Sequence, residues 1–184
     1  MQVFVILSPG FEEIEAITVI DILRRAKIET VTVSLDANTA VMGSHGIVVI
    51  ADRSFDELPE ECGDALVLPG GMKGVTHMQE HAGLLSLIKK YQESGAILAA
   101  ICAAPWILDG LGILRDKAFT CHPCVYDRLQ SAGVQDVPTI TDGQIVTGRS
   151  AGCAMVWSLA LVKALLGSWP DGLLNGLRLE KDPG

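Results

Sequence analysis

Residues 95–106 read Gly95-Ala96-Ile97-Leu98-Ala99-Ala100-Ile101-Cys102-Ala103-Ala104-Pro105-Trp106. This pattern predicts a buried strand that ends at Cys102 and turns at once into a helix, because the flanking alanines let backbones approach closely. A thiol at such a bend meets the amino end of a helix, whose dipole and free N–H groups favour the thiolate. A free cysteine is more often a small buried hydrophobe. The bend makes Cys102 the predicted nucleophile and oxidation target instead.

Strands and helices alternate on both sides of this bend. We expect strands at 3–7, 30–35, 64–68, 117–120, 139–141 and 144–147, a strand that ends at Cys102, and a small hairpin from 40–42 and 46–51. We expect helices at 11–26, 82–94, 103–109, 124–132, 150–166 and 170–177. In the first helix the apolar residues Ile14, Ile17, Val19, Ile20, Ile22 and Leu23 predict a wide inner face. The alternation predicts an α/β fold with a mostly parallel sheet covered on both faces, in a single domain over 1–184.

Three unusual segments end predicted strands, namely Ser8-Pro9-Gly10, Pro69-Gly70-Gly71 and Cys102. Ligands of parallel α/β sheets bind beyond the carboxyl ends of the strands, so these segments should converge in one cleft. Gly70 and Gly71 could form only a tight turn. Beside a thiolate, their N–H groups and that of Ala103 are candidates for an oxyanion-binding site.

The first helix opens with three acids in Gly10-Phe11-Glu12-Glu13-Ile14-Glu15. Complementing the helix N-terminus is a sufficient explanation for Glu12 and Glu13. Glu15 lies nearer the apolar face, where a buried carboxyl group would have a raised pKa and stay protonated. Such a group could hydrogen-bond the sulfur of Cys102 or move protons for a substrate.

His122 lies in the sequence Thr120-Cys121-His122-Pro123-Cys124. It is either a structural histidine or a base near Cys102. The Cys121–Cys124 pair lacks the further ligands that zinc needs, and a thioredoxin-type dithiol normally occupies another position. A resolving role for oxidised Cys102 stays open.

Two further histidines and one arginine complete the polar candidates. His77 and His81 lack the glutamate of a metalloprotease helix and are expected on an exposed polar face. Arg149 follows a strand and is either a solvated charge or an anion contact at the mouth of the cleft.

The composition excludes several functional classes. The chain has 184 residues, 49% of them hydrophobic and 20% charged, which argues against disorder. A net charge of −8 argues against binding to nucleic acid or an anionic membrane. The first ten residues lack a basic n-region, and the longest apolar stretch is too short to cross a bilayer. Five cysteines at irregular spacing do not form a secreted disulfide framework. We therefore expect a soluble cytoplasmic protein.

The segments Pro9–Ala16, Leu68-Pro69-Gly70-Gly71 and Ala99–Pro105 together resemble the ThiJ/PfpI superfamily, and within it the deglycase branch. The resemblance extends over nearly the whole chain. It implies a flavodoxin-like three-layer sandwich and a homodimer. It makes Cys102 the nucleophile, Glu15 its protonated partner and His122 the histidine near the thiol. At the position of His45 this branch often has an arginine that reaches in from the partner subunit, so His45 would be a weaker, pH-dependent charge.

The resemblance also implies the chemistry. The first hypothesis is a cofactor-free and metal-free glyoxalase or deglycase that converts a small aldehyde or glycated substrate, such as methylglyoxal, through Cys102. The second is a redox sensor or chaperone-like stress protein that uses the same oxidisable thiol. A third, an amidase or peptidase, is disfavoured because Ala103 stands where the protease-like branch has a histidine.

Overall fold

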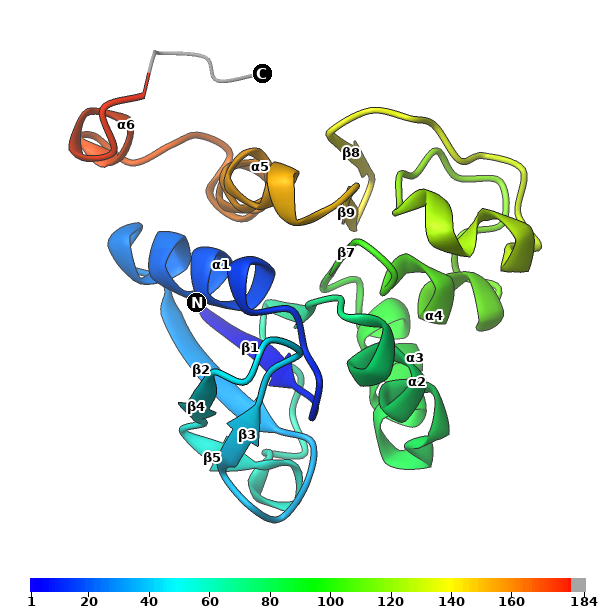
Figure 1. The fold of residues 1–184 in the computed structure, drawn as a ribbon. Helices are drawn as coiled ribbons and strands as arrows, with labels where there is room; N and C mark the ends of the chain where they lie inside the picture. Colours follow the sequence, from blue (N-terminus) through cyan, green and yellow to red (C-terminus); the bar gives the residue numbers. More distant parts are fainter. Residues whose placement is uncertain (180–184) are drawn as a thin grey trace.

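The computed structural model describes residues 1–179, and its centre is a seven-stranded sheet in the order β5-β2-β1-β6-β7-β9-β8 (Figure 1). The strands are β1 (Gln2–Leu7), β2 (Glu29–Ser34), β5 (Arg53–Ser54), β6 (Ala65–Leu68), β7 (Ile97–Ile101), β8 (Thr139–Asp142) and β9 (Ile145–Gly148). Every neighbouring pair is parallel except β8 with β9. The carboxyl ends of β1, β6 and β7 therefore meet at one edge of the sheet.

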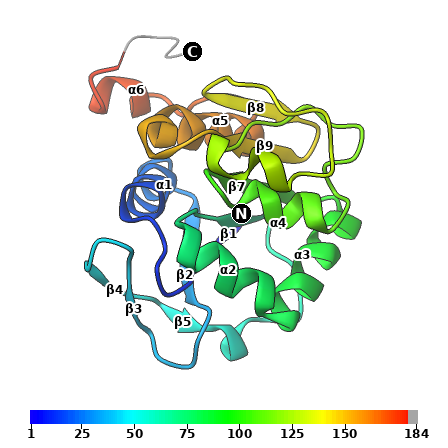
Figure 2. The same cartoon turned by 45° about the vertical axis from the view of Figure 1, so that its right-hand side comes forward.

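Helices cover both faces of this sheet. One face carries α1 (Glu13–Arg25) and α5 (Ala154–Leu166), and the other carries α2 (Met72–Glu80), α3 (Ala82–Ser94) and α4 (Pro105–Gly110), as Figure 2 shows. Side chains alternate along the central strand β1. Val3, Val5 and Leu7 face the first layer, and Phe4 and Ile6 face the second. The predicted three-layer α/β fold is confirmed.

Smaller elements complete the chain. They are the hairpin strands β3 (Ala40–Met42) and β4 (Val48–Ile50), the 3-10 turns η1 (Phe55–Glu57), η2 (Pro123–Arg128) and η3 (Ala151–Cys153), and α6 (Leu173–Gly176). Within residues 1–179 no helix has the length and apolar character needed to cross a membrane.

The predicted elements differ from the observed ones in a few places. The expected helix over 124–132 is only the 3-10 turn η2, since Pro123 starts it and its cap residue Leu129 is already extended. The expected strand over 117–120 forms a single bridge, between Phe119 and Val134. Helix α2 and strand β5 were not predicted.

The first helix buries a narrower face than its apolar pattern predicted. Ile14 is 58% exposed and Ile17 is 44% exposed, so the prediction that both face the core is wrong. Ile17 lines a cavity of about 300 Å³ together with Val49 and Ile50 of β4, so it lies on the side of α1 that faces the hairpin. We call the exposed apolar residues of α1 and the hairpin the hairpin face: Ile14, Ile17, Met42, Ile47, Val48 and Ile50.

Candidate active site

Cys102 is the first residue after β7, where the chain leaves the sheet. Its φ is +63°, a left-handed conformation that a residue with a side chain rarely adopts. Its N–H donates to the carbonyl of Gly148 at 2.9 Å, and its own carbonyl accepts from the N–H of His122 at 2.8 Å. These two bonds hold the half-buried thiol at the carboxyl end of the sheet.

Glu15 lies fully buried in the first turn of α1. Glu12 caps this helix, because its side chain accepts a 2.8 Å hydrogen bond from the N–H of Glu15. The N–H of Gly70 donates to Oε2 of Glu15 at 2.7 Å. The other oxygen, Oε1, is buried with no hydrogen-bond partner. A buried polar atom without a partner is costly, so it is a strong sign of a specific role.

Gly70 lies between the carboxyl group of Glu15 and the side chain of Cys102. A Cβ atom at this position would lie 2.6 Å from Oε2 of Glu15 and 2.7 Å from Cβ of Cys102. No other residue type therefore fits without displacing one of the two groups. The glycine brings Glu15 and Cys102 together, as the convergence of strand ends predicted.

Burial and mutual interaction shift the pKa values of both groups. Burial raises the pKa of Glu15 to about 7, as predicted, although contacts with Cys102 and Gly70 partly oppose the shift. Burial and the charge of Glu15 also raise the pKa of Cys102, whereas the N–H groups of Ala103 and Gly71 lower it. The prediction of a simply depressed thiol pKa is therefore wrong. An ionised Glu15 therefore disfavours the Cys102 thiolate, and a protonated Glu15 removes this charge repulsion.

The predicted oxyanion site is only partly available. The N–H of Gly70 is already donated to Glu15. The N–H groups of Gly71 and Ala103 point to the Cys102 sulfur and remain for an anion that forms there. Gly71 itself has a φ of +89°, and a Cβ atom there would collide with the carbonyl of Gly10.

The backbones of His122 and of Gly148, which precedes Arg149, bond to Cys102. The side chains of His122 and Arg149 are held by other groups. Nδ1 of His122 accepts the N–H of Cys124 at 3.1 Å. Among residues 1–179 no hydrogen bond joins its imidazole to the Cys102 sulfur. Arg149 follows β9 and pairs with the exposed Asp136 at 2.7 Å.

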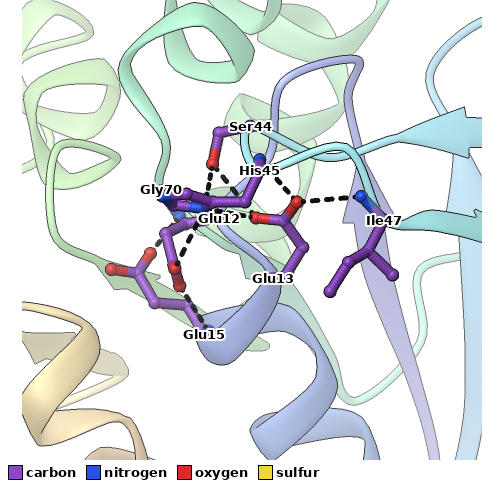
Figure 3. A network of polar contacts seen from close by, with 7 residues as sticks. All are labelled: Glu12, Glu13, Glu15, Ser44, His45, Ile47 and Gly70. Atoms are coloured by element: carbon purple, nitrogen blue, oxygen red, sulfur yellow. Dashed lines mark hydrogen bonds and ion pairs between the residues drawn. The ribbon is translucent and has the colours of Figure 1, made fainter.

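His45 is bound within its own chain, as Figure 3 shows. Its N–H and its Nδ1 contact the two oxygens of Glu13 at 2.6 Å and 2.8 Å, and Ser44 and Ile47 donate to the same carboxylate. Burial alone would raise the pKa of Glu13, but the bonds from His45 and Ser44 lower it to about 2. The hydrogen bond to Glu13 raises the pKa of His45.

From the sequence, Glu13 was assigned to the helix dipole, and its contact with His45 was not predicted. The three residues Glu12, Glu13 and His45 have ligand atoms within 4.8 Å of one another, and in the described part of the chain they are the group that could hold a metal ion. No local pattern identifies them, because 32 positions separate Glu13 from His45.

His77 and His81 were expected on an exposed polar face, and that prediction is wrong. Nδ1 of His77 lies 3.2 Å from the hydroxyl of the buried Ser8, and its Nε2 lies 3.4 Å from Asp36. His81 caps α3 by accepting the N–H of Leu84. Both side chains tie elements together.

A family profile described as "DJ-1/PfpI family" matches residues 1–164 of this chain. The chain belongs to the DJ-1/PfpI family. Among relatives of this family, Protein DJ-1 homolog A of Arabidopsis thaliana is 35% identical over 90% of this chain, which spans only 43% of that protein's length. Protein dj-1beta of Drosophila melanogaster is 34% identical over 89% of this chain and 88% of that protein. Deglycase TK1284 of Thermococcus kodakarensis is 32% identical over 90% and 99% of the respective chains.

Solved structures of DJ-1/PfpI proteins share the fold. The crystal structure of Drosophila melanogaster DJ-1beta superposes with a TM-score of 0.91 at 31% identity, over 97% of this chain and 98% of that one. A structure titled "Toxoplasma gondii DJ-1, oxidized" has a TM-score of 0.90 at 29% identity, over the same shares of the two chains.

Proposed function

We propose that this chain is a cofactor-independent glyoxalase or deglycase-like enzyme that acts on 2-oxoaldehydes of the methylglyoxal type. The observation that carries the proposal is the buried carboxyl group of Glu15 beside the Cys102 thiol, with only Gly70 between them. A carboxyl group with a pKa raised to about 7 exchanges protons readily near neutrality. The name of the Thermococcus relative, a deglycase, supports the same class of chemistry.

The first step forms a bond between sulfur and the aldehyde carbon. The Glu15 carboxylate takes the proton of the Cys102 thiol as the sulfur adds to the carbonyl carbon. The C=O π bond breaks, and Glu15 passes this proton to the carbonyl oxygen. The N–H groups of Gly71 and Ala103 face the sulfur, so they stabilise the negative charge on the sulfur as it loses its proton. The product of this step is a hemithioacetal.

The second step moves a hydrogen between two carbons. The Glu15 carboxylate removes the proton from the former aldehyde carbon, which leaves an enediolate, and returns it to the neighbouring ketone carbon. The hydroxyl proton of the first carbon passes to the oxygen of the second. The first carbon is thereby oxidised to a thioester and the second is reduced to an alcohol, so no external redox partner is needed. Water then cleaves the thioester, which releases a 2-hydroxy acid and restores the thiol.

His122 contributes as a hydrogen-bond donor in this scheme. Because its Nδ1 accepts the N–H of Cys124, the neutral ring carries its hydrogen on Nε2. A ring in that tautomer donates to a substrate oxygen and does not deprotonate the thiol. An amidase or peptidase, which needs a cysteine–histidine pair, is not favoured by this arrangement.

We also propose the homodimer that the family resemblance implies. The hairpin face is apolar and exposed over two adjoining elements, which is typical of a surface covered by a partner. A second copy of the chain would bury it beside the Glu13–His45 contact. Arg149 and His45 are proposed to contact anionic substrate groups at the rim.

The decisive experiment is incubation with methylglyoxal in the absence of glutathione, with lactate as the readout. We expect Cys102→Ala to lose activity by at least about 100-fold, the range of nucleophile deletions. The matched control is Cys62→Ala, which removes a half-buried thiol that precedes β6. A wild-type protein that forms lactate no faster than Cys102→Ala would exclude the enzyme.

The redox-sensor hypothesis shares the thiol and makes a different prediction. One structural relative is an oxidised DJ-1 of Toxoplasma gondii, which supports this second hypothesis. Mild peroxide should then add oxygen to Cys102 before other thiols, as intact mass and peptide mapping would show. Lactate formation without such selective oxidation supports turnover as the role of this site.

A further inference from the structure

The segment Cys121-His122-Pro123-Cys124 lies directly against Cys102 and holds two thiols that the proposed reaction does not use. The N–H of His122 donates to the carbonyl of Cys102 at 2.8 Å. The N–H of Cys124 donates to Nδ1 of His122 at 3.1 Å, and Pro123 begins the 3-10 turn η2. Two cysteines thus flank the residue that is bonded to the nucleophile's main chain.

The two thiols differ in access to solvent. Cys124 is exposed, whereas Cys121 is fully buried. The chain turns between them, since the N–H of Val125 bonds back to the carbonyl of His122 at 3.1 Å. Burial raises the pKa of Cys121 to about 12, and the charge of the neighbouring Cys124 adds to that shift. The turn therefore holds one exposed and one buried thiol three positions apart.

Arg128 gives the exposed thiol a nearby positive charge. Burial raises the pKa of Cys124, and the Arg128 guanidinium opposes this shift. The same guanidinium stacks over the ring of Trp106 at 4.8 Å from the centroid, which fixes its place beside the turn. An oxidant from solvent therefore meets Cys124 first, with a second thiol behind it.

We propose that Cys121 and Cys124 form a second oxidisable site, at which a hydroperoxide converts the two thiols into an intramolecular disulfide. The sulfur of Cys124 attacks the peroxide, the O–O bond breaks, and a sulfenic acid and one water form. The sulfur of Cys121 then attacks that of Cys124, the S–O bond breaks, and hydroxide leaves as water with the Cys121 proton. Two electrons from the thiols reduce one hydrogen peroxide to two waters.

Closure of this bond affects the site of Cys102. Pulling Cys124 toward the buried thiol displaces its N–H from Nδ1 of His122. The imidazole loses the bond that fixes its tautomer, while its main chain stays attached to Cys102. This consequence rests on the proposed function, whereas the formation of the disulfide does not.

Peptide mapping tests the disulfide, because tryptic cleavage after Lys117 and Arg128 yields one peptide, 118–128, that holds both cysteines and no others. The full-length Cys102→Ala protein is treated with hydrogen peroxide, alkylated and digested. We expect this peptide to be lighter by two hydrogen atoms, unalkylated, and restored by dithiothreitol. The matched Cys124→Ser variant should keep one alkylated thiol. A peptide with two alkylated thiols, or with Cys124 oxidised to the sulfinic acid, would overturn the proposal.

Proton NMR tests the link to His122 without any activity measurement. The ring signals of His122 are assigned by comparison with His122→Gln in the Cys102→Ala background. We expect these signals to shift when the disulfide forms and to return on reduction. Unchanged signals in the oxidised protein would exclude the coupling while leaving the glyoxalase proposal intact.

Discussion

The 2.7 Å hydrogen bond from the N–H of Gly70 to Oε2 of Glu15 determines which carboxyl oxygen carries the proton. Oε2 accepts from a donor that cannot be reversed, so a protonated Glu15 has its hydrogen on Oε1. That oxygen is buried and has no other hydrogen-bond partner. The Gly70 amide therefore fixes the orientation of the carboxyl group that lies beside Cys102.

Replacing Glu15 with glutamine should reduce activity and raise stability at alkaline pH. The folded protein keeps the Glu15 proton up to a pKa of about 7, while the unfolded chain releases it near the ordinary value of 4.5. Stability therefore falls as pH rises between these values, by up to about 3 kcal/mol at roughly 1.4 kcal/mol for each pKa unit. The Glu15→Gln variant lacks this loss. Urea unfolding at pH 5 and pH 8 measures it.

The control for this prediction is Glu80→Gln, an exposed position at the end of α2. It should keep the wild-type pH dependence of unfolding and the wild-type activity. Lactate formation by Glu15→Gln should fall about 100-fold or more, the usual contribution of a general acid–base. Full activity in this variant would show that Glu15 moves no proton.

Substituting Gly70 with alanine should separate Glu15 from Cys102. The added Cβ atom would overlap both groups, so one must move, at a cost of about 1–3 kcal/mol for a crowded core position. We expect a fold that persists with a lower melting temperature and a large loss of lactate formation. Gly110→Ala, where a Cβ meets open space, is the control. Equal activity of Gly70→Ala and wild type would contradict the geometry.

The Glu13–His45 contact predicts a loss of stability in acid. The pKa of Glu13 is lowered to about 2 in the folded protein, so its contribution is complete above pH 4.5 and disappears as pH falls toward 2. The pKa of His45 is raised, so its contribution is complete below pH 6.5 and is lost as pH rises through the folded value. Melting temperatures of Glu13→Gln and wild type should differ most near pH 5 and converge as pH falls to about 2. A constant difference would mean that Glu13 acts only through packing.

A charge in the hairpin face should prevent dimer formation. Burying Ile17→Glu in an apolar interface would desolvate an unpaired carboxylate, so we expect sedimentation to give a monomer where the wild type gives a dimer. The control is Leu166→Glu, at the exposed end of α5. A monomeric wild type at micromolar concentration would refute the dimer.

Local patterns were sufficient to predict Cys102 and Glu15. A strand that ends in alanines and a cysteine, and an acid near the apolar stripe of a helix, are both visible within one turn or strand. The rule that strand ends meet at one edge of a parallel sheet then places them together. The sheet itself was predictable because buried strands and amphipathic helices alternate.

Contacts between distant segments were not predictable in this way. The bond between Ser8 and His77 joins residues 69 positions apart, and it forms only because the fold brings α2 to the segment that follows β1. The direction of the Cys102 pKa shift depends on burial and on the Glu15 charge, which outweigh the amide groups that the bend supplies. Ile14 and Ile17 have the helical spacing of core residues, and nothing in that spacing indicates that both side chains are exposed in the folded chain.

The left-handed φ of Cys102 places the thiol at the end of the sheet but lowers the stability of the folded protein. A side chain in this conformation costs roughly 1–2 kcal/mol that glycine avoids. Cys102→Gly should accordingly have a higher melting temperature than Cys102→Ala, although both variants lack the thiol. Exchanging this cysteine for glycine would relieve the torsional cost and remove the thiol in the same step, so the two properties cannot be varied independently at this position.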